Sequence, residues 1–451
     1  MIDFDANGKN KYYSLYKTLR EDIISGKMRG GERLPSKRAL ARMLGVSVTT
    51  VMLAYGQLAA EGYVCPRERS GHFVEKLNGV PNLNKKSSPL YGVGKIPSVK
   101  SGEETRRYSC DLVKGVLPAQ LFPFSTWARL MRRVLNDCGE HLLERVPKDG
   151  DAQLKYAISA YLFRSRGMEV DPRFIVVGAG AEYLYGVIVQ LLGRDKPYAV
   201  ENPCYTKIPS VYALNGAKCL PVAVGEKGMD LRSLGKLAAC AAHVSPSHQF
   251  PTGAVMPASV RAGLIDWANS VDGFIIEDDY DSEFRLEGKP LHSMQSLCPS
   301  RVVYVNTFSK SLAPSMRLGY AVLPPVLYDK FMCSFPDGAS SVSLFEQKTL
   351  AAMLDGGYFE RHVSRLKNYY RTVRGKLLDK LAGKCEVYDT GAGLHLVARF
   401  PSEECDEKIK LVAAERGVRL KCLSDYLISP RPELDLCAVI NYSGLTSEQL
   451  D

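Results

Sequence analysis

Residues 302–322 read VVYVNTFSKSLAPSMRLGYAV, and this stretch decides the fold of most of the chain. It begins with the β-favouring run VVYV, passes through hydroxyl side chains to Lys310, and becomes apolar again after Arg317. Short apolar runs bounded by turn-forming residues predict strands. We therefore expect a strand, a loop that carries a lysine and an arginine, and a second strand that re-enters the sheet.

Similar β-rich runs recur along the chain, mostly separated by helix-compatible stretches: FIVVGAG (174–180), YAVENP (198–203), KCLPVAV (218–224), AAHVSPS (241–247), GFIIEDD (273–279), VVYVNTFS (302–309) and LGYAVLP (318–324). This rhythm predicts βα units and a mainly parallel α/β sheet of about seven strands. Beyond it, EQKTLAAML, FERHVSRLKNYYRTVRGKLLDKL and LHLVARF predict a long helix followed by a small α+β lobe. The expected domain spans 108–451, with the large sheet at about 170–325 and the lobe at about 345–451.

A different pattern occupies residues 10–76. Apolar residues at helical spacing predict a first helix, and Ser36 and Ser47 are placed to cap two further short helices on either side of Gly45. The segment EGYVCPRERSGHFV (61–74) predicts two short strands around a basic tip. Two short helices joined at a glycine and followed by a hairpin predict a winged helix-turn-helix, an α+β unit.

Basic charge is concentrated near the N-terminus. Residues 1–107 hold 19 Lys and Arg against 10 Asp and Glu, whereas the remaining chain holds 40 against 39. Residues 77–107 are rich in Gly, Pro, Ser, Asn and Lys without either period, which predicts a flexible basic linker. An N-terminal basic surplus favours double-stranded DNA as the partner of this part.

Reactive groups follow three of the expected strands, where α/β sheets bind ligands. Asp278 ends GFIIEDD, Lys310 follows VVYVNTFS, and Gly180 leads from FIVVGAG into a helix whose N-terminus suits an anion. A carboxylate, a lysine, hydroxyls, an arginine and a helix N-terminus together fit pyridoxal 5'-phosphate, with the lysine forming a Schiff base and the carboxylate facing the pyridine nitrogen.

The first 75 residues resemble the winged helix-turn-helix of the GntR family, on the motifs GGERLPS, RALARMLGVSVTTV, AYGQLAAEGYV and SGHFV. The residues that this resemblance and the helix pattern place at DNA are Ser36, Lys37, Arg38, Ser47, Thr49, Thr50, Met52, Arg67 and Arg69. Of these, Thr49, Thr50 and Met52 project from the start of the recognition helix toward base edges. The serine at 36 and the basic residues suit phosphates.

The remainder resembles the fold-type I aminotransferase domain of MocR-type regulators, a GntR subfamily, on EDDYDSEFR, NTFSKSLAPSMRLGY, SPSHQFPTGAVMP and ENPCY. The resemblance implies Lys310 as the Schiff-base lysine and Asp278 as the partner of the pyridine nitrogen. It also implies Tyr280 at the phenolic oxygen of the cofactor and Tyr205 against its ring. For the phosphate it implies Gly180, Ala181, Thr307, Ser309 and Arg317.

Three departures from the aminotransferase pattern stand out. Gln249 and Phe250 precede Pro-Thr-Gly where many aminotransferases have an asparagine, and residues 146–149 replace a motif that supplies a tyrosine to the neighbouring subunit. No clean match to the arginine that binds a substrate carboxylate occurs near CAVINYSGL; Arg431 and Lys207 are the candidates.

The leading hypothesis is a homodimeric transcriptional regulator whose aminotransferase-like domain senses pyridoxal phosphate, an amino compound, or both. An active aminotransferase with a DNA-binding head is the alternative, and a silent dimerisation scaffold is the third possibility. The N-terminus MIDFDANGKNKYYS lacks an apolar leader segment, so we expect a cytoplasmic protein. The 12 cysteines show no metal-ligand spacing, so neither disulfides nor a metal is expected.

Overall fold

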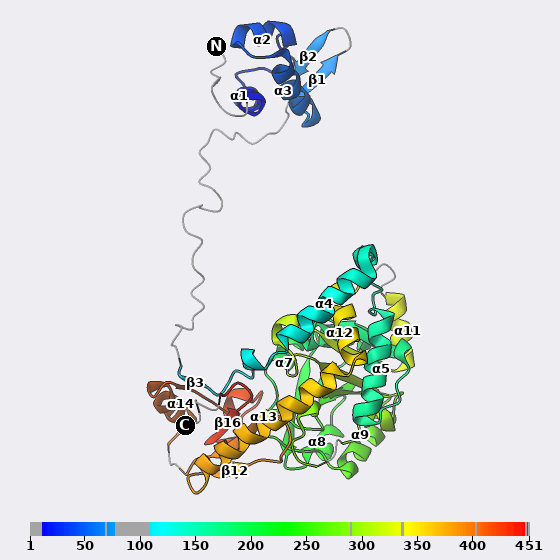
Figure 1. Cartoon of the computed structure of the whole chain (residues 1–451), viewed down its shortest axis with the longest axis vertical. Coiled ribbons are helices and arrows are strands. Elements are labelled where there is room, and N and C mark those ends of the chain that lie inside the picture. Colours follow the sequence, from blue (N-terminus) through cyan, green and yellow to red (C-terminus); the bar gives the residue numbers. More distant parts are fainter. Residues whose placement is uncertain are drawn as a thin grey trace. The chain divides into compact units, whose positions relative to one another are not determined.

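The computed structural model describes residues 11–67, 70–76, 108–288, 291–334, 338–401, 404–446 and 449. The chain divides into two compact units between Arg106 and Arg107 (Figure 1). The expected linker at 77–107 lies outside the described residues.

The N-terminal unit is built from three helices and a hairpin: α1 (Lys11–Ile24), α2 (Lys37–Leu44), α3 (Val48–Ala60), β1 (Val64–Arg67) and β2 (Gly71–Val74). The Ser36 and Ser47 side chains accept hydrogen bonds from the backbone N–H groups of Ala39 and Thr50 and so cap α2 and α3. Gly45 ends α2 at a φ of +65°, which favours glycine in this turn. The winged helix-turn-helix expected from the sequence is therefore present.

The large unit is organised around an eight-stranded sheet in the order β4-β11-β10-β9-β8-β5-β6-β7. Its strands are β4 (Ile175–Gly178), β5 (Tyr198–Asn202), β6 (Cys219–Gly225), β7 (Gly228–Met229), β8 (Ala241–Val244), β9 (Phe274–Asp278), β10 (Val302–Thr307) and β11 (Gly319–Val322). Each of the seven expected runs contains one of these strands. The additional strand, β7, is an antiparallel edge strand of two residues, too short for a sequence pattern to reveal.

Two helical layers cover the sheet. The helices of the unit are α4 (Phe124–Cys138), α5 (Ala152–Arg166), α6 (Ala181–Leu192), α7 (Lys207–Leu214), α8 (Leu231–Leu234), α9 (Ala258–Ser270), α10 (Met294–Leu297), α11 (Pro325–Ser334), α12 (Leu344–Asp355), α13 (Tyr358–Leu381) and α14 (Asp406–Glu415). One face packs on α6, α7 and α11, and the opposite face packs on α5, α8, α9, α12 and the start of α13. Adjacent residues of one strand therefore serve different layers.

The small lobe contains a second sheet in the order β12-β13-β16-β15. Its strands are β12 (Glu386–Tyr388), β13 (His395–Arg399), β15 (Lys421–Cys422) and β16 (Cys437–Asn441). A separate parallel pair joins β3 (Cys110–Asp111) to β14 (Val418–Arg419). The segment that begins the large unit thus lies beside its C-terminal lobe, and α13 extends from α12 to this lobe (Figure 1).

Among the described residues, no single helix has both the length and the apolar composition to cross a bilayer, although α2 and α3, bent by 120°, pass that test as a pair.

Candidate functional site

Asp278 ends β9 on the face of the sheet that α6 covers. The Tyr185 hydroxyl donates a hydrogen bond of 2.6 Å to its Oδ2, and His243 Nε2 lies 3.6 Å from the same oxygen. The Tyr212 hydroxyl lies 2.7 Å from the other nitrogen of His243. The second carboxylate oxygen, Oδ1, is buried without a hydrogen-bond partner among the described residues. A donor from outside the chain, such as a pyridinium N–H, would satisfy this oxygen.

The adjacent Asp279 points to the opposite face. Its Oδ2 lies 3.0 Å from Arg166 Nη1 and accepts a hydrogen bond of 2.6 Å from the Tyr304 hydroxyl. Its Oδ1 also lacks a hydrogen-bond partner, but its charge is balanced by the guanidinium. The two neighbouring carboxylates therefore have different environments: Asp279 pairs with a guanidinium, whereas Asp278 lies beside Tyr185 and His243.

An anion cradle lies where three chain segments converge. Gly180 precedes Ala181, the first residue of α6, and a Cβ on Gly180 would lie 3.2 Å from Cζ of Arg317. A Cβ on Gly319 would lie 3.3 Å from both Gly180 Cα and Thr307 Cγ2. A side chain at either glycine would be crowded, and Gly180 also has a φ of +82°, which favours glycine. Backbone N–H groups at a helix N-terminus, a guanidinium and a hydroxyl fit a phosphate group.

Lys310 lies in the loop after β10 and contacts Gly115, in the segment between β3 and α4. Its Nζ donates a hydrogen bond of 3.2 Å to the carbonyl oxygen of Gly115, where a Cβ would lie 2.6 Å from the amine. Burial lowers the pKa of the Lys310 amine, and the nearby Asp281 carboxylate opposes part of that effect. A lowered pKa makes the neutral, nucleophilic amine more accessible. Ser309 donates its backbone N–H to Thr307 Oγ1 at 3.4 Å, which ties this loop to the cradle.

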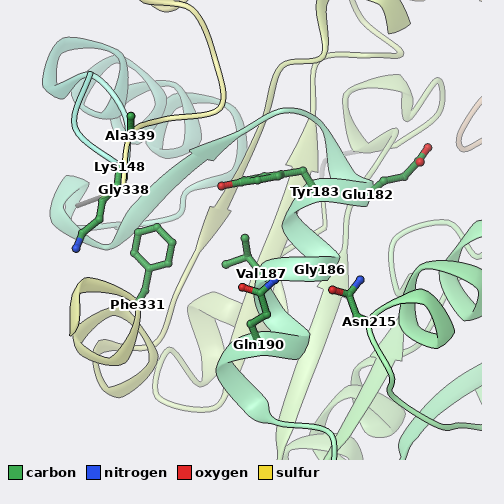
Figure 2. Close-up of a pocket in the computed structure, with 10 residues that line it drawn as sticks. All are labelled: Lys148, Glu182, Tyr183, Gly186, Val187, Gln190, Asn215, Phe331, Gly338 and Ala339. Atoms are coloured by element: carbon green, nitrogen blue, oxygen red, sulfur yellow. The ribbon is translucent and has the colours of Figure 1, made fainter. Parts of the chain in front are cut away.

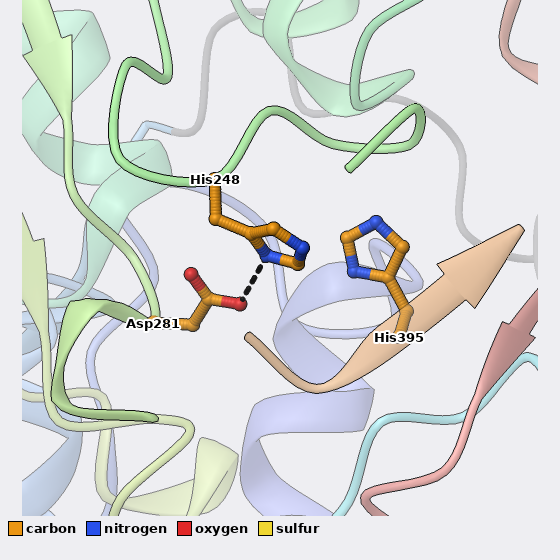
Figure 3. Close-up of side chains that lie close together, drawn as sticks. All are labelled: His248, Asp281 and His395. Atoms are coloured by element: carbon orange, nitrogen blue, oxygen red, sulfur yellow. Dashed lines mark hydrogen bonds and ion pairs between the residues drawn. The ribbon is translucent and has the colours of Figure 1, made fainter. Parts of the chain in front are cut away.

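Tyr280 is supported by a buried histidine pair. Its hydroxyl lies 3.3 Å from His248 Nδ1, and the same nitrogen lies 3.0 Å from Asp281 Oδ2. The His395 ring centroid is 4.3 Å from that of His248, and Figure 3 shows the two rings beside each other with Asp281 on the far side of His248. Burial holds the pKa of His395 well below its usual value. These three side chains lie within metal-ligand reach of one another, but the facing atoms of His248 and Asp281 already bond each other.

Tyr205 follows β5 and is 40% exposed, with its ring centroid 6.0 Å from that of Phe250 in an edge-on contact. An exposed ring at the mouth of the site can stack on a planar ligand. Gln249 does not face this site: its amide donates to the carbonyl oxygens of Pro203 and Phe250, at 2.9 and 2.8 Å. Gln249 therefore links its own loop to the loop after β5 through hydrogen bonds, while its neighbour Phe250 contacts Tyr205.

The two candidate cations for a carboxylate already have partners. Arg431 Nη1 donates to the carbonyl oxygens of Asn202 and Val224, at 3.0 and 2.7 Å, and its Nε lies 2.9 Å from Glu433. Lys207 Nζ lies 2.6 Å from Glu182 Oε1, in the first turn of α6. A ligand carboxylate would have to share either cation with the acceptors that it already has.

An open hollow of about 350 Å³ lies outside this constellation, over α6. Figure 2 shows Tyr183, Val187 and Gln190 of α6 on one side and Phe331 opposite. None of the predicted cofactor residues lines it, so the candidate site is the Lys310 region.

The N-terminal unit exposes most of the residues expected at DNA: Ser36, Arg38, Ser47, Thr49, Met52 and Arg67, while Lys37 and Thr50 are half-buried. The Thr50 hydroxyl bonds that of Ser47 at 2.8 Å, and the Arg67 guanidinium stacks over Phe73 at 4.5 Å. Arg69 lies outside the described residues. Among the described residues, the first turn of α3 presents Thr49 and the exposed Val48, Met52 is exposed in the next turn, and the wing presents Arg67.

Comparison with known proteins follows this division. Residues 11–74 match the profile of bacterial regulatory proteins of the gntR family. The HTH-type transcriptional regulator YdeL of Bacillus subtilis is 33% identical over 91% of this chain and 88% of its own length. The probable rhizopine catabolism regulatory protein MocR of Rhizobium meliloti is 32% identical over 99% and 92%. The chain belongs to the GntR family, as a MocR-type regulator.

The large unit of this MocR-type regulator has the fold of a type I aminotransferase. The crystal structure of Pyrococcus horikoshii kynurenine aminotransferase superposes with a TM-score of 0.68 at 21% identity, covering 77% of this chain and 89% of that one. At this identity the likeness shows the fold alone.

Several residues that shape the MocR-type site were not found from the sequence. Tyr185 lies one turn into α6, His243 interrupts an otherwise apolar strand, and Gly115 lies 195 residues before Lys310. A polar residue inside the run AAHV was the one local signal available. Gly115 belongs to a segment that the pairing of β3 with β14 and the hydrogen bond from Asn441 N–H to the Leu112 carbonyl hold against the small lobe.

Proposed function

We propose that this MocR-type regulator binds pyridoxal phosphate through Lys310 and uses that site to sense the cofactor, an amino compound, or both. The supporting observation is the Asp278 carboxylate: Tyr185 donates a hydrogen bond to its Oδ2, while its buried Oδ1 has no hydrogen-bond partner among the residues that the structure describes. When bound, pyridoxal phosphate supplies an aldehyde that amines condense with and a ring that accepts electrons. The residues present fit that group at both of its ends.

Each part of the proposed site has one task. Asp278 would hold the proton of the ring nitrogen, and Tyr280, backed by His248, would hold the phenolic oxygen. Tyr205 would cover the ring. The cradle of Gly180, Ala181, Thr307, Ser309 and Arg317 would bind the phosphate, and Lys310 would supply the amine, with Gly115 limiting its movement.

We favour sensing over turnover because of the cations. A transaminating enzyme needs a group that binds the substrate carboxylate, and both Arg431 and Lys207 are engaged by other groups. The protein we propose is a cytoplasmic homodimer, in which each subunit brings one winged helix-turn-helix to double-stranded DNA. An effector would change the DNA affinity only if it binds more tightly to one domain arrangement than to the other. The largest possible change in DNA-binding free energy equals the difference between the effector's binding free energies for the two arrangements.

The test is an absorbance titration of the full chain with pyridoxal phosphate. We expect a visible band in the wild type that Lys310→Ala abolishes. Lys330→Ala is the matched control, because Lys330 also donates to a backbone carbonyl but lies on α11. A wild-type protein without a band, or a band that survives in Lys310→Ala, would refute cofactor binding through Lys310. A gel-shift titration on the promoter of the chain's own operon, with and without cofactor, then measures the coupling to DNA.

A further inference from the structure

A second cavity lies on the opposite face of the sheet from Tyr185 and α6. Its volume is about 160 Å³, and its walls come from α5, β10, α13 and the segment that follows β9. None of the residues proposed to hold pyridoxal phosphate lines it. Five charged side chains line the cavity: Arg166, Glu283, Arg285, Glu360 and Lys367.

Several polar atoms of these charged side chains lack a hydrogen-bond partner in the described part of the chain. Arg285 has two buried nitrogens, Nε and Nη1, without an acceptor. Glu283 Oε2 and Glu360 Oε2 are buried without a donor, and so is Nε of Arg166, a residue only 8% exposed, without an acceptor. Arg166 is paired with Asp279, and Glu360 is paired with Arg164. Among the described residues that line the cavity, Glu283, Arg285 and Lys367 are the charged side chains without an ion pair. Removing such charges from water is costly unless something else satisfies them.

The ionisation of the lining groups is consistent with this cost. Burial raises the pKa of Glu283 to about 7, and burial lowers the pKa of Lys367. Both groups are thus shifted toward their neutral forms. A ligand that brings an opposite charge to each would reverse these shifts.

We propose that this cavity is a binding site for a small zwitterion, an amino acid of about the size of alanine or serine. Its carboxylate would accept hydrogen bonds from Arg285, and its ammonium would donate to Glu283. At about 30 Å³ per water molecule, the cavity has room for roughly five waters or one such molecule. Waters could satisfy the hydrogen bonds but would bring no charge to either side chain.

The cavity shares a chain segment and an ion pair with the proposed cofactor site. Glu283 and Arg285 follow Asp278 and Tyr280 in one short segment, so a ligand that moves them pulls on both cofactor contacts. Arg166 lines the cavity and pairs with Asp279, the neighbour of Asp278. The site is therefore placed to act as an effector site that does not need Lys310, and the inference is independent of the cofactor proposal.

The experiment measures binding of glycine, L-alanine and L-serine to the full chain without pyridoxal phosphate, by titration calorimetry. Acetate and methylamine serve as single-charge controls. We expect L-alanine or L-serine to bind with the same dissociation constant in wild type and Lys310→Ala. Glu283→Gln and Arg285→Gln should each weaken binding about tenfold or more. Arg361→Gln, an exposed arginine of α13 outside the cavity, should bind as the wild type does.

The stability of the unliganded variants adds a second readout. Arg285→Gln removes a half-buried charge that has no ion pair among the described residues, so its unfolding temperature without ligand should equal or exceed that of the wild type. Amino acids should then raise the unfolding temperature of the wild type but not that of the variant. The proposal is overturned if no probe binds at about 10 mM, if binding requires both pyridoxal phosphate and Lys310, or if Arg285→Gln binds as tightly as the wild type.

Discussion

The adjacent carboxylates Asp278 and Asp279 offer a direct test of how the site is built, because replacing each by asparagine keeps its shape. Asp279 is 1% exposed and paired with Arg166 at 3.0 Å, so Asp279→Asn leaves a buried guanidinium without its partner. Breaking a buried ion pair from one side costs about 3–5 kcal/mol. Glu277 and Glu283 remain near Arg166, which places the expected loss toward the lower end, about 3 kcal/mol.

Asp278→Asn should behave differently. Asp278 accepts its short hydrogen bond from the neutral Tyr185 hydroxyl, and an asparagine oxygen can still accept it. The free energy of unfolding should therefore stay within about 1 kcal/mol of the wild-type value, while the visible band obtained with pyridoxal phosphate is lost. Asp279→Asn should keep that band under conditions in which it is folded.

Urea unfolding followed by tryptophan fluorescence suits this comparison, since both tryptophans, Trp127 and Trp267, lie in the large unit. With an m-value of about 3 kcal/mol/M, a loss of 3 kcal/mol lowers the midpoint by about 1 M urea. If Asp278→Asn shows the large shift and Asp279→Asn unfolds like the wild type, the two roles have been assigned the wrong way round.

Four further outcomes are expected. Arg317→Gln should weaken pyridoxal phosphate binding about tenfold or more, and inorganic phosphate should compete less well for the variant; equal affinities in a spectroscopic titration would remove Arg317 from the cradle. Burial raises the pKa of Glu201 to about 8, so its protonated form is favoured in the folded state. The free energy of unfolding should therefore fall as the pH rises from about 4.5 to 8. In urea titrations, Glu201→Gln should reduce that fall by about 1 kcal/mol or more. Ser47→Ala removes the cap of α3 and should cost the N-terminal unit about 1 kcal/mol, measured by circular dichroism melting, whereas an unchanged melt would mean that water replaces the cap. Arg38→Ala should weaken binding to all DNA sequences alike and reduce the slope of log affinity against log salt by about 1; a loss confined to one sequence would instead indicate base reading.

Much of the architecture could be predicted because local patterns of apolar, capping and turn residues determine it. The seven apolar runs became strands, and the capped helices around Gly45 became the helix-turn-helix. Lys310, Asp278 and Gly180 could be placed near one another because each follows a strand of the same sheet, and strand ends meet at one edge. Such features depend on neighbours within a few residues, so composition and spacing suffice to predict them.

The sequence by itself therefore determined a winged helix-turn-helix, a mainly parallel α/β domain and the residues at its strand ends. Tertiary structure decided which of two adjacent carboxylates faces α6 and which pairs with Arg166, because strand alternation gives opposite faces but packing decides what lies on each. It also brought Gly115 next to Lys310 and gave Arg431 and Lys207 other partners. In the described part of the chain it left two nitrogens of Arg285 without acceptors beside a cavity. Those contacts join residues far apart in the chain, and their geometry is fixed by how whole layers pack rather than by any local pattern.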